Sequence, residues 1–369
     1  MKLYKKHISD LGKVITGKTP RTSILENYGG KIPFLTPSDN LSEKFSPTTS
    51  KTLTKIGLNE VKNCLLPSKS ICVSCIGSDL GKVVLTKKPT VTNQQFNSIV
   101  PNEENDADFI YYLMTVVGKH LNYLSKTSTA VPIINKSTFA NYEIEIPNIK
   151  EQKRIGKILS SLDDKIELNR RINDNLEQQA QALFNEMFPH ITEGENMIGD
   201  LIMPKRGKGL LSKNAIKGDI PVVAGGIEPA TYHNQANTNA PVLTIAASGA
   251  NAGYINLWHI PVWASDSSYI DESITPNVYF WYVMLNKRQK EIFDAQVGSA
   301  QPHIYPKHIA ELPLNNVPVE KITEYNNIVT SMFEKRGQLV LENKRLASLR
   351  DILLPKLMSG ELKINEINN

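Results

Sequence analysis

The chain has 369 residues, of which 40% are hydrophobic and 21% charged, the balance of a globular protein and not of a disordered chain. No apolar run approaches the roughly 20 residues that a membrane-spanning helix needs, and no apolar core follows the N-terminal lysines as in a secretory signal. The formal charge of +5 permits a nucleic-acid partner without requiring one. Three cysteines in the first third suit a reducing compartment, so we expect a cytoplasmic protein.

The first 148 residues have the pattern of a mostly β domain. Apolar runs of strand length, such as 70–76 and 82–85, are bounded by residues that favour turns. Residues 107–122 are predicted to form one helix, and 8–14 a short helix or a strand. We therefore predict a globular domain over 1–148.

Residues 149–189 are predicted to form one long helix. The segment follows Pro147, ends at Pro189 and contains a single glycine. Its apolar residues recur every 3.5 positions, which is typical of a helix that pairs with a second helix. The residues of this seam are Ile155, Leu159, Leu162, Ile166, Asn173, Leu176 and Leu183.

The same arrangement returns about 170 residues later. A shift of 170 aligns Tyr112 with Tyr282 and Asn173 with Asn343, and a shift of 172 aligns Gly77 with Gly249. This indicates a tandem duplication. The second seam consists of Val329, Met332, Leu339, Asn343, Leu346, Leu353 and Leu357.

The duplication predicts an α+β fold in which two mostly β domains are each followed by a long helix. The second domain is expected over 190–316, with one helix over 275–293, and the second long helix over 317–360, followed by a tail over 361–369. The alternative is that the two helices are ordinary amphipathic helices packed on globular cores.

Residues 12–19 satisfy the phosphate-loop pattern GxxxxGK[ST], but the context is wrong for a nucleotide site. That mechanism needs a buried strand before the loop and a helix after it. The preceding segment carries two lysines and a histidine, and Pro20 follows Thr19. We expect instead a loop whose amides and Lys18 hold a nucleic-acid phosphate.

Cys72 and Cys75 form a CxxC within a strand-like run. Their side chains are expected on opposite faces of the strand, and the repeat carries Thr244 and Ala247 at these positions. A structural zinc site needs four ligands. We therefore expect no metal site here.

Motifs of DNA chemistry are missing from the sequence. The adenine-methyltransferase loop, a glycine-rich turn for S-adenosylmethionine and a set of nuclease carboxylates are all absent, and the histidines, such as His120 and His233, have no carboxylate or cysteine partner in sequence. We expect no catalytic residue.

Six segments in a fixed order carry a resemblance to a known family. With the duplication, they make the chain resemble the DNA-specificity (S) subunit of a Type I restriction–modification system over almost its whole length. The segments are GKTP at 17–20, KIPFLTPSD at 31–39, CIGSDLGK at 75–82, TNQQFNSI at 92–99, EQKRIGKIL at 151–159 and LRDILLPKLMSGEL at 349–362.

The resemblance implies an architecture and a set of partners. Each domain is then a target-recognition domain that reads one half of a bipartite, asymmetric site on double-stranded DNA, and the helices form an antiparallel coiled coil that spaces the half-sites. Two modification (adenine methyltransferase) subunits dock on the helices, and restriction subunits add translocation and cleavage. S-adenosylmethionine, ATP and Mg are expected on those partners, and no cofactor and no membrane contact on this chain.

Loop residues with polar side chains are the candidates for reading DNA, because Asn and Gln suit adenine edges and Lys suits guanine or phosphate. In the first half they are Lys18, Thr19, Ser78, Lys82, Asn93, Gln94, Gln95, Lys126, Thr127 and Ser128. In the second half they are Lys208, Ser248, Asn251, Ser265, Asp266, Ser267, Gln296, Ser299, Gln301 and His303. The repeat aligns Asn93-Gln94 with Ser265-Asp266, so the two half-sites should differ.

Two other functions stay open. One is a DNA-modifying enzyme with an unrecognised site, which binding of S-adenosylmethionine by the isolated chain would favour. The other is a coiled-coil adaptor without DNA contact, which absent or salt-independent DNA association would favour.

Overall fold

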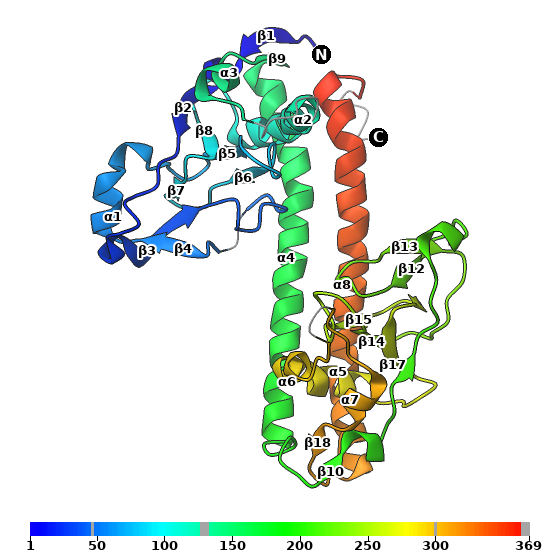
Figure 1. Cartoon of the computed structure of the whole chain (residues 1–369). Helices are drawn as coiled ribbons and strands as arrows, with labels where there is room; N and C mark the ends of the chain where they lie inside the picture. Colours follow the sequence, from blue (N-terminus) through cyan, green and yellow to red (C-terminus); the bar gives the residue numbers. More distant parts are fainter. Residues whose placement is uncertain (46–47, 126–132, 299–300, 363–369) are drawn as a thin grey trace. The chain divides into compact units, whose positions relative to one another are not determined.

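The computed structural model describes residues 1–45, 48–125, 133–298 and 301–362, and the chain divides into two compact units (Figure 1). Unit 1 contains residues 1–167 and 344–369, and unit 2 contains 168–343. The long helices α4 (Ile149–Met187) and α8 (Val319–Ser359) both cross this division. Each unit is therefore one β domain with a segment of both helices, and the two predicted long helices are confirmed.

Unit 1 contains three sheets. Four antiparallel strands lie in the order β2-β8-β5-β6, while β3 lies between antiparallel β4 and parallel β7, and β1 pairs with β9. Its strands are β1 (Tyr4–His7), β2 (Gly12–Thr16), β3 (Tyr28–Leu35), β4 (Lys51–Leu53), β5 (Ile71–Ser74), β6 (Val83–Leu85), β7 (Val91–Thr92), β8 (Phe96–Pro101) and β9 (Glu143–Ile146). Its other helices are α1 (Lys55–Glu60), α2 (Ala107–Ser125) and α3 (Lys136–Ala140).

The main core of unit 1 lies between the four-stranded sheet, α2 and the long helices. Ile71 and Val73 point from one face of β5 into this core, which also contains Tyr112 of α2, Leu159 of α4 and Leu357 of α8. The alternation of side chains along a strand places Ile71 and Val73 on the same face. The long helices are thus part of the domain core.

Unit 2 repeats this topology strand for strand. The order β11-β17-β14-β15 matches β2-β8-β5-β6, the sheet β13-β12-β16 matches β4-β3-β7 with its parallel pair in the same place, and β10–β18 matches β1–β9. The duplication is therefore confirmed. Its strands are β10 (Asn196–Met197), β11 (Lys205–Arg206), β12 (Ile220–Val223), β13 (Thr231–His233), β14 (Val242–Ala246), β15 (Ile255–Trp258), β16 (Trp263–Ala264), β17 (Ser267–Asp271) and β18 (Pro313–Leu314).

The helix predicted over 275–293 is two helices, α5 (Val278–Lys287) and α6 (Gln289–Asp294), and α7 (Pro306–Ala310) follows. Arg288 separates α5 from α6. Its side chain is buried, pairs with Glu291 at 2.5 Å and donates to the backbone carbonyl of Pro313. A buried guanidinium needs these partners, and they hold Arg288 away from helical geometry.

Contacts within unit 2 show that the helix segments pack antiparallel. Near the start of its α4 segment, Asn169 Nδ2 donates to Asn343 Oδ1 at 2.9 Å. Further along α4, the carbonyl of Ala180 accepts from the Tyr325 hydroxyl at 2.9 Å. The partner number falls as the α4 number rises, so the two helices run in opposite directions.

Every predicted seam residue is buried or half-buried. Phe184 and Phe333 lie outside the predicted seam and are also fully buried, in the domain core of unit 2. The helices therefore pack both on each other and on the domains, so the alternative of amphipathic helices on globular cores is correct in part. No helix among the described residues is long and apolar enough to cross a membrane.

His259, which follows β15, predicts a pH dependence for unit 2. Its ring packs so closely on α8 that a Cβ added at Gly337 would lie 2.5 Å from its Cγ. Burial, with a smaller contribution from Arg336, lowers the pKa of His259 to about 4. An unfolded histidine has a pKa of about 6.5, so the unfolded state takes up the proton first as the pH falls.

The free energy of unfolding of unit 2 should therefore keep the full contribution of neutral His259 above about pH 6.5. It should fall by up to about 3 kcal/mol as the pH decreases towards 4. All three tryptophans lie in unit 2: Trp258, Trp263 and Trp281. Tryptophan fluorescence during urea unfolding at about pH 7 and at about pH 5 therefore measures this loss of stability directly. The His259→Gln variant should show a smaller difference between the two pH values. A variant that kept the whole pH dependence would assign it to other groups.

Candidate nucleic-acid interface

Three loops of unit 1 meet at one end of its four-stranded sheet. The amide of Cys75, after β5, donates to the carbonyl of Gln95 at 2.7 Å. Thr19, in the loop after β2, donates its hydroxyl to Gln94 Oε1 at 2.6 Å. Asn93 Nδ2 donates to Gln95 Oε1 at 2.8 Å. The structure thus brings the predicted residues of the 17–20 and 92–99 segments together, with Gln94 exposed and Gln95 half-buried.

The expected phosphate-holding amides are not available at residues 17 and 18. The Gly17 amide donates to the Phe96 carbonyl at 3.1 Å, and the Lys18 amide donates to the Thr92 carbonyl at 3.0 Å. The predicted role of these amides is therefore wrong, because both complete the backbone bonding around β8. The exposed Lys18 side chain remains a candidate for phosphate contact.

Cys72 and Cys75 lie on opposite sides of their strand, as predicted. Cys72 belongs to a small cluster with Leu35 and Phe96, and Cys75 to the main core. Burial raises the pKa of Cys72 to about 12 and that of Cys75 to about 11. Both thiols are therefore protonated and unreactive at neutral pH.

The turn after β5 carries two other candidates, Ser78 and Lys82, whose side chains have different surroundings. Gly77 and Gly81 adopt left-handed conformations with φ of 86° and 87°, which favour glycine. Ser78 is exposed on this turn, whereas Lys82 faces a pocket beside the long helices. The candidates Lys126, Thr127 and Ser128 lie outside the described residues.

The equivalent loops of unit 2 hold a charged cluster. Arg206 Nη2 lies 2.6 Å from Asp266 Oδ1, and Ser248 donates its hydroxyl to the other carboxylate oxygen. The Ala247 amide donates to the Asp266 carbonyl at 3.1 Å, as Cys75 does to Gln95 in unit 1. Asp266 therefore stands where unit 1 has Gln95.

Two backbone hydrogen bonds mark equivalent positions in both units. They join Gly17 to Phe96 and Lys18 to Thr92 in unit 1, and Gly207 to Ser267 and Lys208 to Ala264 in unit 2. Between these marks unit 1 has three residues and unit 2 only two, Ser265 and Asp266. The ungapped alignment of Gln94 with Asp266 is therefore wrong. Ser267 takes the position of Phe96 within β17 and is fully buried, so its predicted contact with DNA is also wrong.

The remaining candidates of unit 2 differ in their exposure and in whether their polar groups already have hydrogen-bond partners. Ser248 pairs through its backbone with His303, whose half-buried ring stacks on Tyr305 at 5.9 Å between centroids. The side chain of Gln296 donates to a backbone carbonyl of the β14–β15 turn, which occupies it. Ser265 is buried, and its hydroxyl oxygen accepts from the Leu210 amide at 2.8 Å. Asn251 is half-buried, and Lys208 and Gln301 are exposed. Ser299 lies outside the described residues.

A family model and individual relatives both match this chain, and they point to the same family. The family model of the Type I restriction modification DNA specificity domain matches residues 2–178. The MjaIX specificity subunit of Methanocaldococcus jannaschii is 26% identical over 98% of this chain and 94% of its own length. The HindI specificity subunit of Haemophilus influenzae is 38% identical over 46% of this chain and 38% of its own. The family model thus covers just under half of the chain, and over almost its whole length the chain is similar to Type I restriction–modification specificity subunits.

The fold of this chain is also similar to that of a solved structure. The S subunit of a Type I restriction–modification system from M. genitalium matches 97% of this chain and 96% of its own with a TM-score of 0.61 and 22% identity. At this identity the likeness concerns the fold alone, and it is the fold built from two repeated β domains and two long helices.

The structure adds two cationic residues, Arg206 and Lys136, to the candidates predicted from the sequence. Arg206 has 39% of its side chain exposed beside Asp266, and the basic Arg-Gly-Lys-Gly run at 206–209 was the available signal. Lys136 of α3 lies near enough to Cys64 that it and Lys18 oppose the burial-driven rise in the pKa of that thiol. No group of His, Cys, Asp and Glu in the described parts of the chain is arranged to hold a metal ion.

Proposed function

We propose that each β domain reads one half of a bipartite site on double-stranded DNA and that the chain itself catalyses no reaction. The observation that carries this proposal is the repeated sheet topology with different polar side chains at equivalent loops. A repeated scaffold supports two binding surfaces of the same placement, and unlike side chains support two unlike base sequences.

The loop chemistry suggests which bases each domain reads. In unit 1 the neutral amides of Gln94 and Gln95 match the donor and acceptor pair of adenine in the major groove. Asn93 is buried, and its side chain holds Gln95 through two hydrogen bonds. In unit 2 the half-exposed Arg206 matches guanine, and Asp266 can accept from the amino group of cytosine. On DNA, Arg206 would leave Asp266 and bind a base edge instead. The free-energy cost of this change is small, because only one exposed ion pair is lost.

The paired helices are proposed to set the distance between half-sites and to dock the modification subunits. Large apolar side chains are exposed on both helices, including Leu168 on α4 and Leu349 and Ile352 on α8. Exposed apolar residues on a helix support a protein partner. Because each unit contains one segment of both helices, we propose two modification subunits. We assign S-adenosylmethionine, ATP and Mg to the partner subunits.

The expected result for the DNA-reading residues is a loss of specificity confined to one half-site. Gln95→Ala should relax one half of the methylated motif and Arg206→Ala the other, each by about 1–3 kcal/mol of base discrimination. Sequencing of methylated adenines in a host that carries the chain with its modification partner reads both halves at once. Glu104→Ala, an exposed change on the loop before α2, is the matched control and should leave both halves unchanged.

Relaxation of both halves by either single variant would contradict the assignment of one reader to each half. Unaltered motifs in both variants would remove Gln95 and Arg206 from the DNA surface. Binding of S-adenosylmethionine by the isolated chain would support the enzyme alternative instead.

A further inference from the structure

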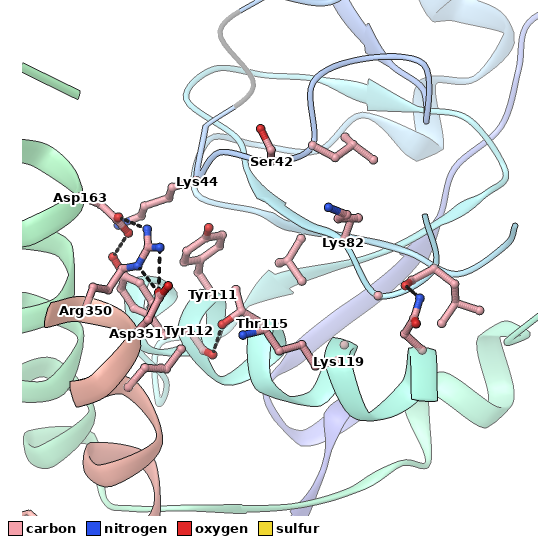
Figure 2. Close-up of a pocket in the computed structure, with 17 residues that line it drawn as sticks. Ser42, Lys44, Lys82, Tyr111, Tyr112, Thr115, Lys119, Asp163, Arg350 and Asp351 are labelled. Atoms are coloured by element: carbon pink, nitrogen blue, oxygen red, sulfur yellow. Dashed lines mark hydrogen bonds and ion pairs between the residues drawn. The ribbon is translucent and has the colours of Figure 1, made fainter. Parts of the chain in front are cut away.

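Unit 1 contains a pocket of about 470 Å³ beside the long helices (Figure 2). Its walls come from residues 41–44, from the turn at 80–83, from one side of α2 and from the unit 1 segments of α4 and α8. The volume is within the range of small-molecule sites, about 300–1,000 Å³. The DNA-reading loops described above do not include most of these residues.

Four charged side chains of the pocket lining are already paired. Arg350 lies 2.6 Å from Asp163 and 2.8 Å from Asp351. Lys44, whose side chain is only 4% exposed, lies 2.5 Å from Asp108 behind the wall. Burial opposes ionisation of Asp108, but the hydrogen bond and charge of Lys44 outweigh it and lower its pKa. These side chains are therefore already engaged with partners of opposite charge.

Two lysines in the pocket have no such partner. Lys82 and Lys119 are exposed at the mouth and face the hollow in Figure 2, and neither forms an ion pair within the described residues. The lining as a whole has four cationic side chains and two carboxylates, Asp163 and Asp351. The pocket therefore has an excess of positive charge at its mouth, which favours an anion.

Tyr111 adds a hydrogen-bond donor. The residue is 7% exposed, and its hydroxyl points into the hollow with no hydrogen-bond partner in the part of the chain that the structure describes. Burial raises the pKa of Tyr111, and Asp163 adds to the rise, so the phenol keeps its proton. The hydroxyl is accessible from the hollow, so this donor can bond a ligand that accepts from it.

The repeat provides an internal comparison. At four of the positions that correspond to the pocket by the 170-residue shift, unit 2 has apolar side chains that belong to its hydrophobic core. Thr115, Asp163, Arg350 and Leu354 of unit 1 correspond to Leu285, Phe333, Ala180 and Phe184 of unit 2. These four positions are thus filled by packing in unit 2 and line an open pocket in unit 1. Stability alone favours the packed version.

We propose that this pocket binds a free phosphate ester no larger than a nucleotide. The phosphate would lie between the ammonium groups of Lys82 and Lys119 and accept from the Tyr111 hydroxyl, which are donors suited to a dianion. This site is separate from the proposed reading of DNA and does not depend on it. The same donors could hold a phosphate of the DNA backbone, and the test separates the two sources.

The test is isothermal titration calorimetry of the full chain with AMP, inorganic phosphate and adenosine. AMP and phosphate should bind saturably, and adenosine should not. The double variant Lys82→Gln/Lys119→Gln should lower the affinity for AMP at least about tenfold, and Tyr111→Phe by a smaller factor. Lys88→Gln/Lys290→Gln removes two exposed lysines outside the pocket and should leave the affinity unchanged.

A filling variant keeps the test independent of folding defects. Thr115→Leu introduces the residue that unit 2 has at the corresponding position, so the chain should stay folded by circular dichroism while AMP binding is lost. Absence of saturable AMP and phosphate binding at millimolar concentration would overturn the proposal. So would equal binding of adenosine, AMP binding unchanged by the lysine variants, or displacement of AMP by a short DNA duplex without a target site.

Discussion

Phe184→Ala is expected to lower the free energy of unfolding of unit 2 by about 3–5 kcal/mol. The Phe184 ring is fully buried, with its centroid 5.5 Å from that of Phe280 in α5 and 5.4 Å from that of Tyr325 in α8. It thus joins α4, α8 and the domain, and truncation leaves a cavity among rings that cannot collapse readily. Urea unfolding of the full chain, followed by the fluorescence of the unit 2 tryptophans, measures the effect.

Leu354→Ala is the matched control in the other unit. Leu354 corresponds to Phe184 by the 170-residue shift and is buried in the core of unit 1, where its loss should cost about 2–5 kcal/mol. Unit 1 contains no tryptophan, so this change should appear in circular dichroism with a smaller shift of the tryptophan transition. Equal shifts of the tryptophan transition in both variants would mean that the units unfold as one cooperative body.

Lengthening both long helices is expected to lengthen the spacer of the methylated motif. Four residues inserted into α4 between Glu167 and Leu168, and four into α8 between Asn343 and Lys344, add about 6 Å to each helix at the division between units. At about 3.4 Å per base pair this corresponds to one or two base pairs. Both half-sites should keep their bases, because no residue of either domain changes.

The control insertion leaves the helices intact. Four residues added between Glu193 and Gly194, in the link that follows α4, should not alter the spacer. Methylome sequencing of both variants gives the comparison. An unchanged spacer in an active complex with lengthened helices would show that the helices do not set the distance.

Local periodicity made the large-scale fold predictable. A 3.5-residue repeat between Pro147 and Pro189 identifies a long helix without any tertiary information, because helix geometry alone determines which residues share a face. The duplication was visible because equivalent core positions, such as Tyr112 and Tyr282, kept their side chains. The helix break at Arg288 was not visible, since it depends on a carbonyl in β18, 25 residues away.

The candidate site was predictable only in part, for a reason that lies in tertiary contacts. The Gly17 and Lys18 amides bond to carbonyls at the start of β8 and at the end of β7, which lie more than about 70 residues further along the chain. An ungapped alignment could not show that unit 2 has one residue fewer between Thr92 and Phe96 equivalents, so it placed the buried Ser267 at the surface. Arg206 gained its role from Asp266, a partner that only the folded sheet supplies.

The central claim, that two domains read two halves of one site, is tested most directly by exchanging one domain. Residues 197–317 would be replaced by the matching segment of another specificity subunit that keeps aromatic residues where Phe280 and Trp281 pack, so that the long helices retain their core contacts. Methylome sequencing of a host with the exchanged chain and its modification partner reads the outcome. One half of the methylated motif should be replaced while the other half stays unchanged. Alteration of both halves would contradict one reading domain for each half-site.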